Sequence, residues 1–203
     1  MHALIVVAHP DPKSLSHGVA ACLAEGVGMA GHTFEIADIA REGFDPRYTA
    51  TDLAVHRREV APAADVAAEQ ARIDGADTLV LVYPVYWWSM PALLKGWIDR
   101  VFANGWAYDE GAGIKPVKRL RHLKVHLVAI GGATTRTYAR HGYFGAMKTQ
   151  IDHGIFDYVG APVATSELML DTETQGPAEH LEAAHAIGRN LFEAIRHAET
   201  EAA

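Results

Sequence analysis

Aromatic side chains are concentrated in one short stretch of the chain, YPVYWWSMP at residues 83–91. It follows an apolar run at residues 78–82 that is typical of a buried strand. Turns normally use Gly, Asn, Asp or Ser, and a large aromatic surface is costly to leave in water. Trp87 and Trp88 are therefore expected to be covered by the core, by a second subunit or by a flat ligand. A flat tricyclic ring would find apolar contacts here, and backbone N–H donors from the residues that follow Pro84.

Hydroxyl and imidazole groups follow an earlier apolar run, in the segment HPDPKSLSH at residues 9–17. Ser14 and Ser16 stand just ahead of a predicted helix, where free backbone N–H groups and the positive end of the helix dipole favour an anion. The segment therefore suggests a phosphate site. The alternative is that one of the two serines simply caps the helix, a role that phosphate binding would not exclude.

Paired glycines follow another apolar run, in GGATTRTYARHG at residues 131–142. Gly131 and Gly132 stand directly at the predicted strand end, where glycine lets the backbone approach a ligand closely. Tyr138 and the neighbouring threonines add polar groups. The alternative is a flexible loop in which the glycines only turn the chain.

Apolar runs of strand length alternate with helix-length segments along the chain. Residues 43–62 are polar and are expected to be irregular, and the basic segment at residues 115–124 is expected to be a solvated connection. Five alternating strands predict an α/β fold: a flavodoxin-like three-layer sandwich with a five-stranded parallel sheet in order 2-1-3-4-5 and helices on both faces. We expect one domain over residues 1–203. Strands are predicted at residues 3–8, 33–39, 78–82, 125–130 and 163–170, and helices at residues 16–30, 63–73, 91–102, 144–156 and 178–198.

The predicted strand order carries a prediction about the site. Ligands of such sheets bind beyond the carboxyl ends of the strands where the strand order reverses, here between the first and third strands. The three segments described above follow the first, third and fourth strands, so we expect them to meet at one edge of the sheet. GVGMAG at residues 26–31 matches a dinucleotide fingerprint, but it closes a helix instead of opening one and is interpreted as a helix end.

Composition argues against several other classes of protein. A net charge of −7, without a basic stripe interleaved with aromatic residues, argues against a nucleic-acid partner. Residues 78–94 carry no charge, yet Pro84 and Pro91 break the stretch, so no membrane insertion is predicted. The single cysteine, Cys22, and an N-terminal stretch without a basic leader favour a reducing, cytoplasmic setting.

Twelve histidines raise the question of a metal site. His122 and His126 stand at a predicted strand entry, and His180 and His185 on a predicted helix. Neither pair has evident carboxylate or thiolate partners along the chain, so no metal site is predicted.

The segment PVYWWSMPALLKGWIDRVFANGWAYD at residues 84–109 resembles the signature segment of the NAD(P)H:quinone oxidoreductases, the DT-diaphorase-like flavoproteins. The AHP…S-x-S pattern at residues 8–16 and the glycine–tyrosine spacing at residues 131–145 resemble the other two flavin loops of that family. The likeness extends from residue 3 to about residue 170, and its central segment is the most specific part.

The resemblance implies a homodimer that carries a flavin at its interface, with FMN favoured by the compact chain and FAD possible. Tyr138 is the implied catalytic residue, and Tyr108 and Trp88 are the implied substrate-binding residues, Tyr108 reaching into the other subunit's pocket. The residues implied in flavin binding are His9, Ser14 and Ser16 for the phosphate, and Pro84, Val85, Tyr86, Trp87, Trp88, Gly131, Gly132 and Tyr138 around the ring.

Two positions depart from the family pattern. Ser16 stands where mammalian members have asparagine. Phe144 stands where one of them has the histidine that partners the tyrosine in proton transfer, so a Tyr–His relay does not carry over by position. His141 is the nearby substitute to consider.

The implied activity is hydride transfer from NAD(P)H through the flavin to a quinone or similar small acceptor. One flat pocket serving both substrates predicts a ping-pong mechanism. One alternative is a flavin-binding regulatory (ancillary) subunit of a potassium-efflux system, which some relatives of this family resemble. Another is a flavodoxin electron carrier, against which the missing threonine-rich phosphate loop argues.

Overall fold

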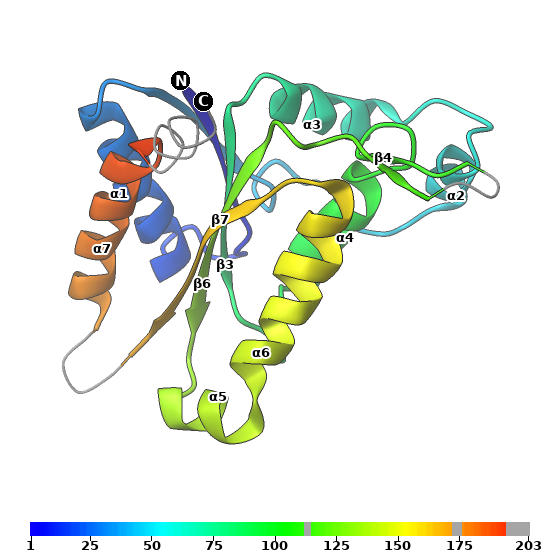
Figure 1. Ribbon diagram of the computed structural model, residues 1–203. Coiled ribbons are helices and arrows are strands. Elements are labelled where there is room, and N and C mark those ends of the chain that lie inside the picture. Colours follow the sequence, from blue (N-terminus) through cyan, green and yellow to red (C-terminus); the bar gives the residue numbers. More distant parts are fainter. Residues whose placement is uncertain (112–114, 172–175, 194–203) are drawn as a thin grey trace, which may run out of the picture.

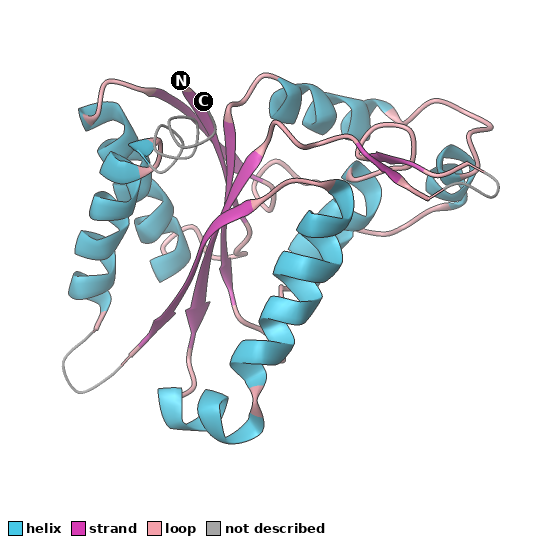
Figure 2. Cartoon of the chain, viewed as in Figure 1, coloured by secondary structure: helices cyan, strands magenta, loops and turns pink. Residues whose placement is uncertain are grey.

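The computed structural model describes residues 1–111, 115–171 and 176–193. A five-stranded sheet runs through the centre, in the order β2-β1-β3-β6-β7, and every pairing in it is parallel. Helices cover both faces, with α1 and α7 on one side and α3, α4 and α6 on the other (Figures 1 and 2). The predicted flavodoxin-like α/β fold is confirmed, since β6 and β7 are the fourth and fifth strands of this sheet.

The five strands of this sheet correspond closely in position to the five predicted strands. They are β1 (His2–Val7), β2 (Thr33–Asp38), β3 (Thr78–Pro84), β6 (Lys124–Gly131) and β7 (Val163–Leu170). A separate antiparallel pair is formed by β4 (Tyr108–Asp109) and β5 (Val117–Lys118). The helices are α1 (Leu15–Met29), α2 (Ala50–His56), α3 (Ala64–Asp74), α4 (Ala92–Val101), α5 (Thr135–His141), α6 (Tyr143–Lys148), the π-helix η1 (Thr149–Asp157) and α7 (Pro177–Asn190).

The side chains of β1 alternate between two hydrophobic cores, one on each face of the sheet. Ala3, Ile5 and Val7 are buried against α1 and α7, whereas Leu4 and Val6 are buried in the core on the other face, which also holds α4 and η1. Successive side chains of a strand point to opposite faces, and a strand covered on both faces is apolar throughout. This explains why the unbroken apolar run at residues 3–8 is a strand.

Three local predictions are corrected by the structure. The polar segment 43–62 contains the helix α2, which a capping box starts: Thr49 N–H donates to Asp52 Oδ2 (2.7 Å), and Asp52 N–H to Thr49 Oγ1 (3.2 Å). The basic segment 115–124 contains β5 and is not only a connection. The predicted helix at 144–156 is confirmed, but it divides into α6 and η1, and the C-terminal part of the helix predicted at 178–198 lies outside the described residues.

The dinucleotide-like glycines at residues 26–31 lie at the end of α1, as predicted, and one of them also belongs to a helix contact. Gly26 lies on the face of α1 that meets α7, where a β-carbon would collide with the carbonyl oxygen of His185. Gly188 of α7 in turn lies against the Leu23 carbonyl. Gly31 ends the segment with a φ of +78°, which glycine adopts without strain. Across the three described ranges, no helix is both long and apolar enough to cross a membrane.

Candidate active site

The three predicted loops leave the sheet at neighbouring strand ends. β1, β3 and β6 are adjacent in the sheet and parallel, with Val7 opposite Val82 and Pro84 opposite Ile130. Their ends are joined by two backbone hydrogen bonds, from Ala8 N–H to the Val82 carbonyl (3.1 Å) and from Val85 N–H to the Ile130 carbonyl (2.8 Å). The predicted meeting of these loops at one sheet edge therefore follows from the observed topology.

The first loop forms the N-terminus of α1. Ser14 caps the helix, its Oγ accepting a hydrogen bond from His17 N–H (3.4 Å), and the first turn carries no acidic residue. His17 also contacts Ser14 Oγ through Nδ1 (2.9 Å) and Asp38 through Nε2 (2.9 Å). Ser16 is buried in the first turn, and His9 is half-buried. Helix capping and anion binding are thus compatible here, because Ser14 caps the helix and the N-terminus of the helix suits an anion.

The second loop is a tight turn closed by reciprocal hydrogen bonds between Tyr86 and Ser89, at 3.0 and 3.1 Å. Its two central residues, Trp87 and Trp88, have φ values of +49° and +61°. Such turns normally take Asn-Gly, because a side chain in the left-handed region is strained by roughly 1–2 kcal/mol. Strain of this kind is concentrated at functional sites, so two tryptophans held here point to a role beyond turning the chain.

The two tryptophans have different surroundings, which the sequence did not distinguish. Trp88 is half-buried and stacks on Tyr143 of α6, with ring centroids 3.8 Å apart and planes 10° apart. It also meets Tyr138 edge to face, at 5.3 Å. Trp87 is 94% exposed. Trp88 is therefore a fixed wall, and Trp87 is the aromatic surface that remains to be covered.

Pro84 and Gly131 are buried at the ends of their strands and pack within the protein. Pro84 is the buried last residue of β3, where the sequence placed it at the start of the loop. Gly131 ends β6 and is also buried; a β-carbon there would lie 2.6 Å from both Tyr138 Oη and Leu170 Cδ2. Gly132 is exposed, and a β-carbon on it would meet nothing within 4 Å. Of the two glycines, Gly132 is thus the one whose backbone a ligand can approach.

Tyr138 lies on the helix α5, where the sequence predicts a loop. Thr134 caps this helix, its side chain accepting a hydrogen bond from Thr137 N–H. The side chain of Tyr138 is 1% exposed, and burial raises the pKa of the phenol above its usual value. Phe144 contacts the Tyr138 ring at 5.3 Å, which places a non-titrating side chain beside the tyrosine. His141 stacks on Tyr143 (5.4 Å). The hydroxyl of Tyr138 lies beside Gly131.

A pocket of about 200 Å³ lies between the second and third loops. Its lining is aromatic on one side and backbone-rich on the other, a combination that suits a flat ring with polar edges. A second pocket, of about 500 Å³, adjoins the first loop and is lined by His9, Pro10, Pro12, Asp38, Ala40 and Arg41. The first of these two pockets, the aromatic pocket, is lined by Val85, Trp87, Trp88, Gly132, Ala133 and Tyr138.

Tyr108 is not brought to this pocket within one chain. It lies on β4, at the end of the molecule near α2, well away from α5 (Figure 1). Its hydroxyl is 3.3 Å from His56 Nδ1, and its ring meets Tyr158 edge to face. The predicted contact of Tyr108 with a pocket therefore requires a second subunit.

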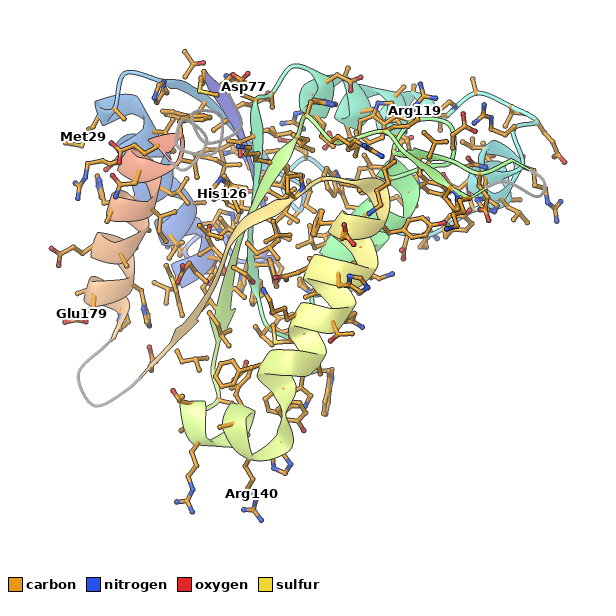
Figure 3. The ribbon with its side chains drawn as sticks, viewed as in Figure 1. Met29, Asp77, Arg119, His126, Arg140 and Glu179 are labelled. Atoms are coloured by element: carbon orange, nitrogen blue, oxygen red, sulfur yellow. The ribbon has the colours of Figure 1, made fainter. Side chains whose placement is uncertain are left out.

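The charged side chains of α5 and α6 near this edge of the sheet lie mostly outside the aromatic pocket. Arg140 on α5 points away from the rest of the molecule (Figure 3), and Lys148 on α6 pairs with Asp152 at 2.9 Å. The pocket itself is lined by uncharged side chains.

Comparison with known proteins agrees with this geometry. A family model described as flavodoxin-like fold matches residues 1–191. The chain is 27% identical over 195 residues to the mouse protein named ribosyldihydronicotinamide dehydrogenase [quinone], covering 87% of this chain and 84% of the relative. It is 30% identical to the ribosyldihydronicotinamide dehydrogenase-like protein traD of Penicillium crustosum, covering 80% and 70%. The NAD(P)H:quinone oxidoreductase structure from Methanothermobacter marburgensis superposes with a TM-score of 0.83 at 28% identity, covering 94% and 98%.

Proposed function

We propose, since the chain belongs to the flavodoxin-like fold family, that it is an NAD(P)H:quinone oxidoreductase that works through a bound flavin. One observation carries the proposal most directly. The aromatic pocket at the ends of β3 and β6 is flat-walled, uncharged and open at the Gly132 backbone, beside a helix N-terminus suited to phosphate. The names of the mouse and Methanothermobacter relatives support the same activity.

Each loop would contribute a different part of the flavin site. Ser14 and the free N–H groups at the start of α1 would hold the phosphate, with His9 beside them. Trp88 would support one edge of the ring, and Trp87 would be covered by it. The Gly132 backbone would approach the polar edge of the ring. The sequence length favours FMN over FAD as the group held.

When bound, the flavin supplies hydride transfer, taking a hydride from NAD(P)H and passing it to a quinone-like acceptor. The protein's part is to orient the reactants and to stabilise charge. Burial raises the pKa of Tyr138, and its hydroxyl would donate toward negative charge that develops nearby. Both substrates would use the same aromatic pocket in turn, which gives ping-pong kinetics.

A homodimer would complete this site. Trp87 lies almost fully exposed at the pocket, and Tyr108 is remote from it in its own chain. In the proposed dimer, Tyr108 of one subunit reaches the pocket of the other and contacts the acceptor. A chain with one cysteine suits the cytoplasm, where this activity would operate.

The absorption spectrum of the purified protein tests the proposal, followed by mass spectrometry of the released chromophore and steady-state kinetics. We expect bound flavin and parallel double-reciprocal lines with NAD(P)H and benzoquinone. Protein that neither retains nor takes up flavin contradicts the proposal. Bound flavin with negligible turnover would instead favour the regulatory role in a potassium-efflux system.

A further inference from the structure

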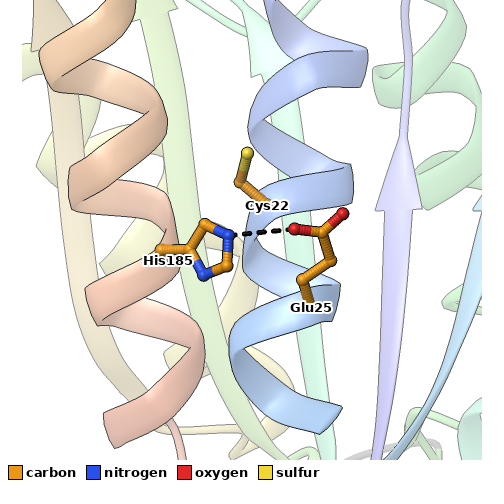
Figure 4. A group of neighbouring side chains, drawn as sticks. All are labelled: Cys22, Glu25 and His185. Carbon is orange, nitrogen blue, oxygen red and sulfur yellow. Dashed lines mark hydrogen bonds and ion pairs between the residues drawn. The ribbon is translucent and has the colours of Figure 1, made fainter. Parts of the chain in front are cut away.

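Three potential metal ligands of different kinds meet where α1 packs against α7. Cys22 and Glu25 lie on α1 and face His185 of α7 (Figure 4). Their ligand atoms all lie within 4.8 Å of one another, and His185 Nε2 is 2.9 Å from Glu25 Oε2. Spacing along the chain does not reveal this group, because its residues are brought together by two helices distant in sequence.

We propose that Cys22, Glu25 and His185 form a binding site for Zn²⁺, independent of the flavin pocket. A thiolate, an imidazole and a carboxylate are the three protein ligands that zinc takes, with distances of about 2.0–2.3 Å. A tetrahedral ion with such bonds separates its ligand atoms by roughly 3.4–3.6 Å, so rotamer adjustments of about 1 Å bring the three atoms into place. Water would fill the fourth position.

The backbone around the group is already fixed. Gly26 follows Glu25 directly and touches the His185 carbonyl, and Gly188 lies one turn beyond His185 against the Leu23 carbonyl. Both contacts lie at one crossing of the two helices and hold them at a short separation beside the group. The helices therefore present the ligands without any rearrangement of the fold.

The ring of His185 is oriented for ligation through one nitrogen. Nδ1 is buried, whereas Nε2 faces Glu25 and Cys22. The side chains of Cys22 and His185 are half-buried and that of Glu25 is exposed, so an ion can enter from solvent and keep a water ligand. Zinc binding would release the Cys22 proton to solvent, since a metal-bound thiol is deprotonated.

The donor set selects the class of ion. A thiolate and an imidazole favour zinc and other borderline ions, while Mg²⁺ prefers oxygen ligands in an octahedral shell. Mg²⁺ is thus a control cation of equal charge. A bound Zn²⁺ would join α1, whose N-terminus forms the first loop of the active site, to α7.

Alkylation of Cys22 tests the proposal, because the chain has only one cysteine. The purified protein is treated with iodoacetamide with and without Zn²⁺, and the labelled fraction is followed by intact mass. At a free Zn²⁺ concentration about ten times the Kd, only one site in about eleven is empty, so labelling should slow about tenfold. Mg²⁺ should leave the rate unchanged.

Two variants and one control locate the site. His185→Gln and Glu25→Gln should lose most of the protection, and His153→Gln, which alters an exposed helical histidine outside the group, should keep it. Circular dichroism of each variant establishes that the fold is intact. Equal labelling rates with and without Zn²⁺, equal protection by Mg²⁺, or full protection in His185→Gln would each overturn the proposal. Neither flavin content nor oxidoreductase activity enters the measurement.

Discussion

The indole of Trp88 stacks on the ring of Tyr143, with centroids 3.8 Å apart and planes 10° apart. This contact joins the turn after β3 to the start of α6, and so fixes one wall of the pocket to a helix of the fold. A wall fixed before a ligand arrives reduces the ordering that binding requires.

Replacing Trp88 with alanine should therefore weaken flavin binding. The change removes the indole that would contact the ring and the stack that fixes it in place, and one aromatic contact contributes about 0.5–1.5 kcal/mol, so the Kd for FMN should rise by about twofold to tenfold. Fluorescence titration of the apoprotein measures the change. Trp106→Ala is the matched control, since Trp106 bonds Asp74 and lies outside the pocket; equal losses in both variants would contradict this role of Trp88.

Trp87→Asn should raise stability and lower activity. Asparagine tolerates a φ of +49° better than tryptophan does, and a side chain that is 94% exposed contributes little to the core, so unfolding should cost about 1 kcal/mol more. The loss of the indole should raise the KM for a quinone. Urea unfolding and steady-state kinetics give the two values, and a variant that is less stable than the parent would show that the turn is not strained.

The two neighbouring glycines should respond differently to alanine. A β-carbon on Gly131 would lie 2.6 Å from Tyr138 Oη and Leu170 Cδ2, so Gly131→Ala should lower the free energy of unfolding by about 1–3 kcal/mol. Gly132→Ala meets no neighbour within 4 Å and should fold with nearly parental stability. Denaturant unfolding compares them directly. If both variants lose the same stability, the close contact at Gly131 is not the cause.

Tyr138→Phe should reduce kcat without unfolding the protein. The ring contacts with Trp88 and Phe144 remain, but the hydroxyl is lost, and the rate should fall by on the order of a hundredfold if that hydroxyl stabilises developing charge. Stopped-flow flavin reduction by NADH measures the step. Tyr143→Phe removes a hydroxyl while keeping the Trp88 stack, and it should retain most of the rate.

Stability should fall in acid because of His126, which lies on β6 in the buried centre of the sheet (Figure 3). Burial, with a smaller effect of Lys124, lowers the pKa of His126 to about 4, against 6.5 for the free group. The unfolded chain therefore binds a proton that the folded one does not, and the contribution is present above pH 6.5 and lost as the pH falls toward about 4.

The full loss corresponds to about 3 kcal/mol, at 1.4 kcal/mol for each unit of pKa difference. His126→Phe keeps a ring at this position without a titrating group, and should flatten the pH dependence of unfolding relative to the parent. Urea unfolding at several pH values between 4 and 6.5 measures it. Parallel curves for the parent and the variant would assign the acid sensitivity to other groups.

The sheet could be predicted from the sequence because its inner strands β1, β3 and β6 are short apolar runs bounded by turn residues, and burial on both faces requires that pattern. The helix α2 was missed since it lies among polar residues, although Thr49 and Asp52 carry a capping signal. The helix α5 was missed because seven residues are too few for a periodic pattern.

The loops of the site could be predicted, but the roles of individual side chains could not. Paired tryptophans in the sequence look equivalent, and only the turn geometry separates the stacked Trp88 from the exposed Trp87. The same holds for the two glycines. Gly131 is buried against Tyr138, which lies on a helix whose position depends on the tertiary fold. The group of Cys22, Glu25 and His185 depends on contact between the first and last helices, which no local pattern reports.

That helix contact has a consequence for synthesis of the chain. The face of α1 that carries Gly26 is covered by α7, whose partner glycine, Gly188, is made long after α1. Until α7 has left the ribosome, the apolar side of α1 stays open to solvent and to other nascent chains. Chaperone binding during translation should therefore concentrate on α1 and end once α7 has emerged.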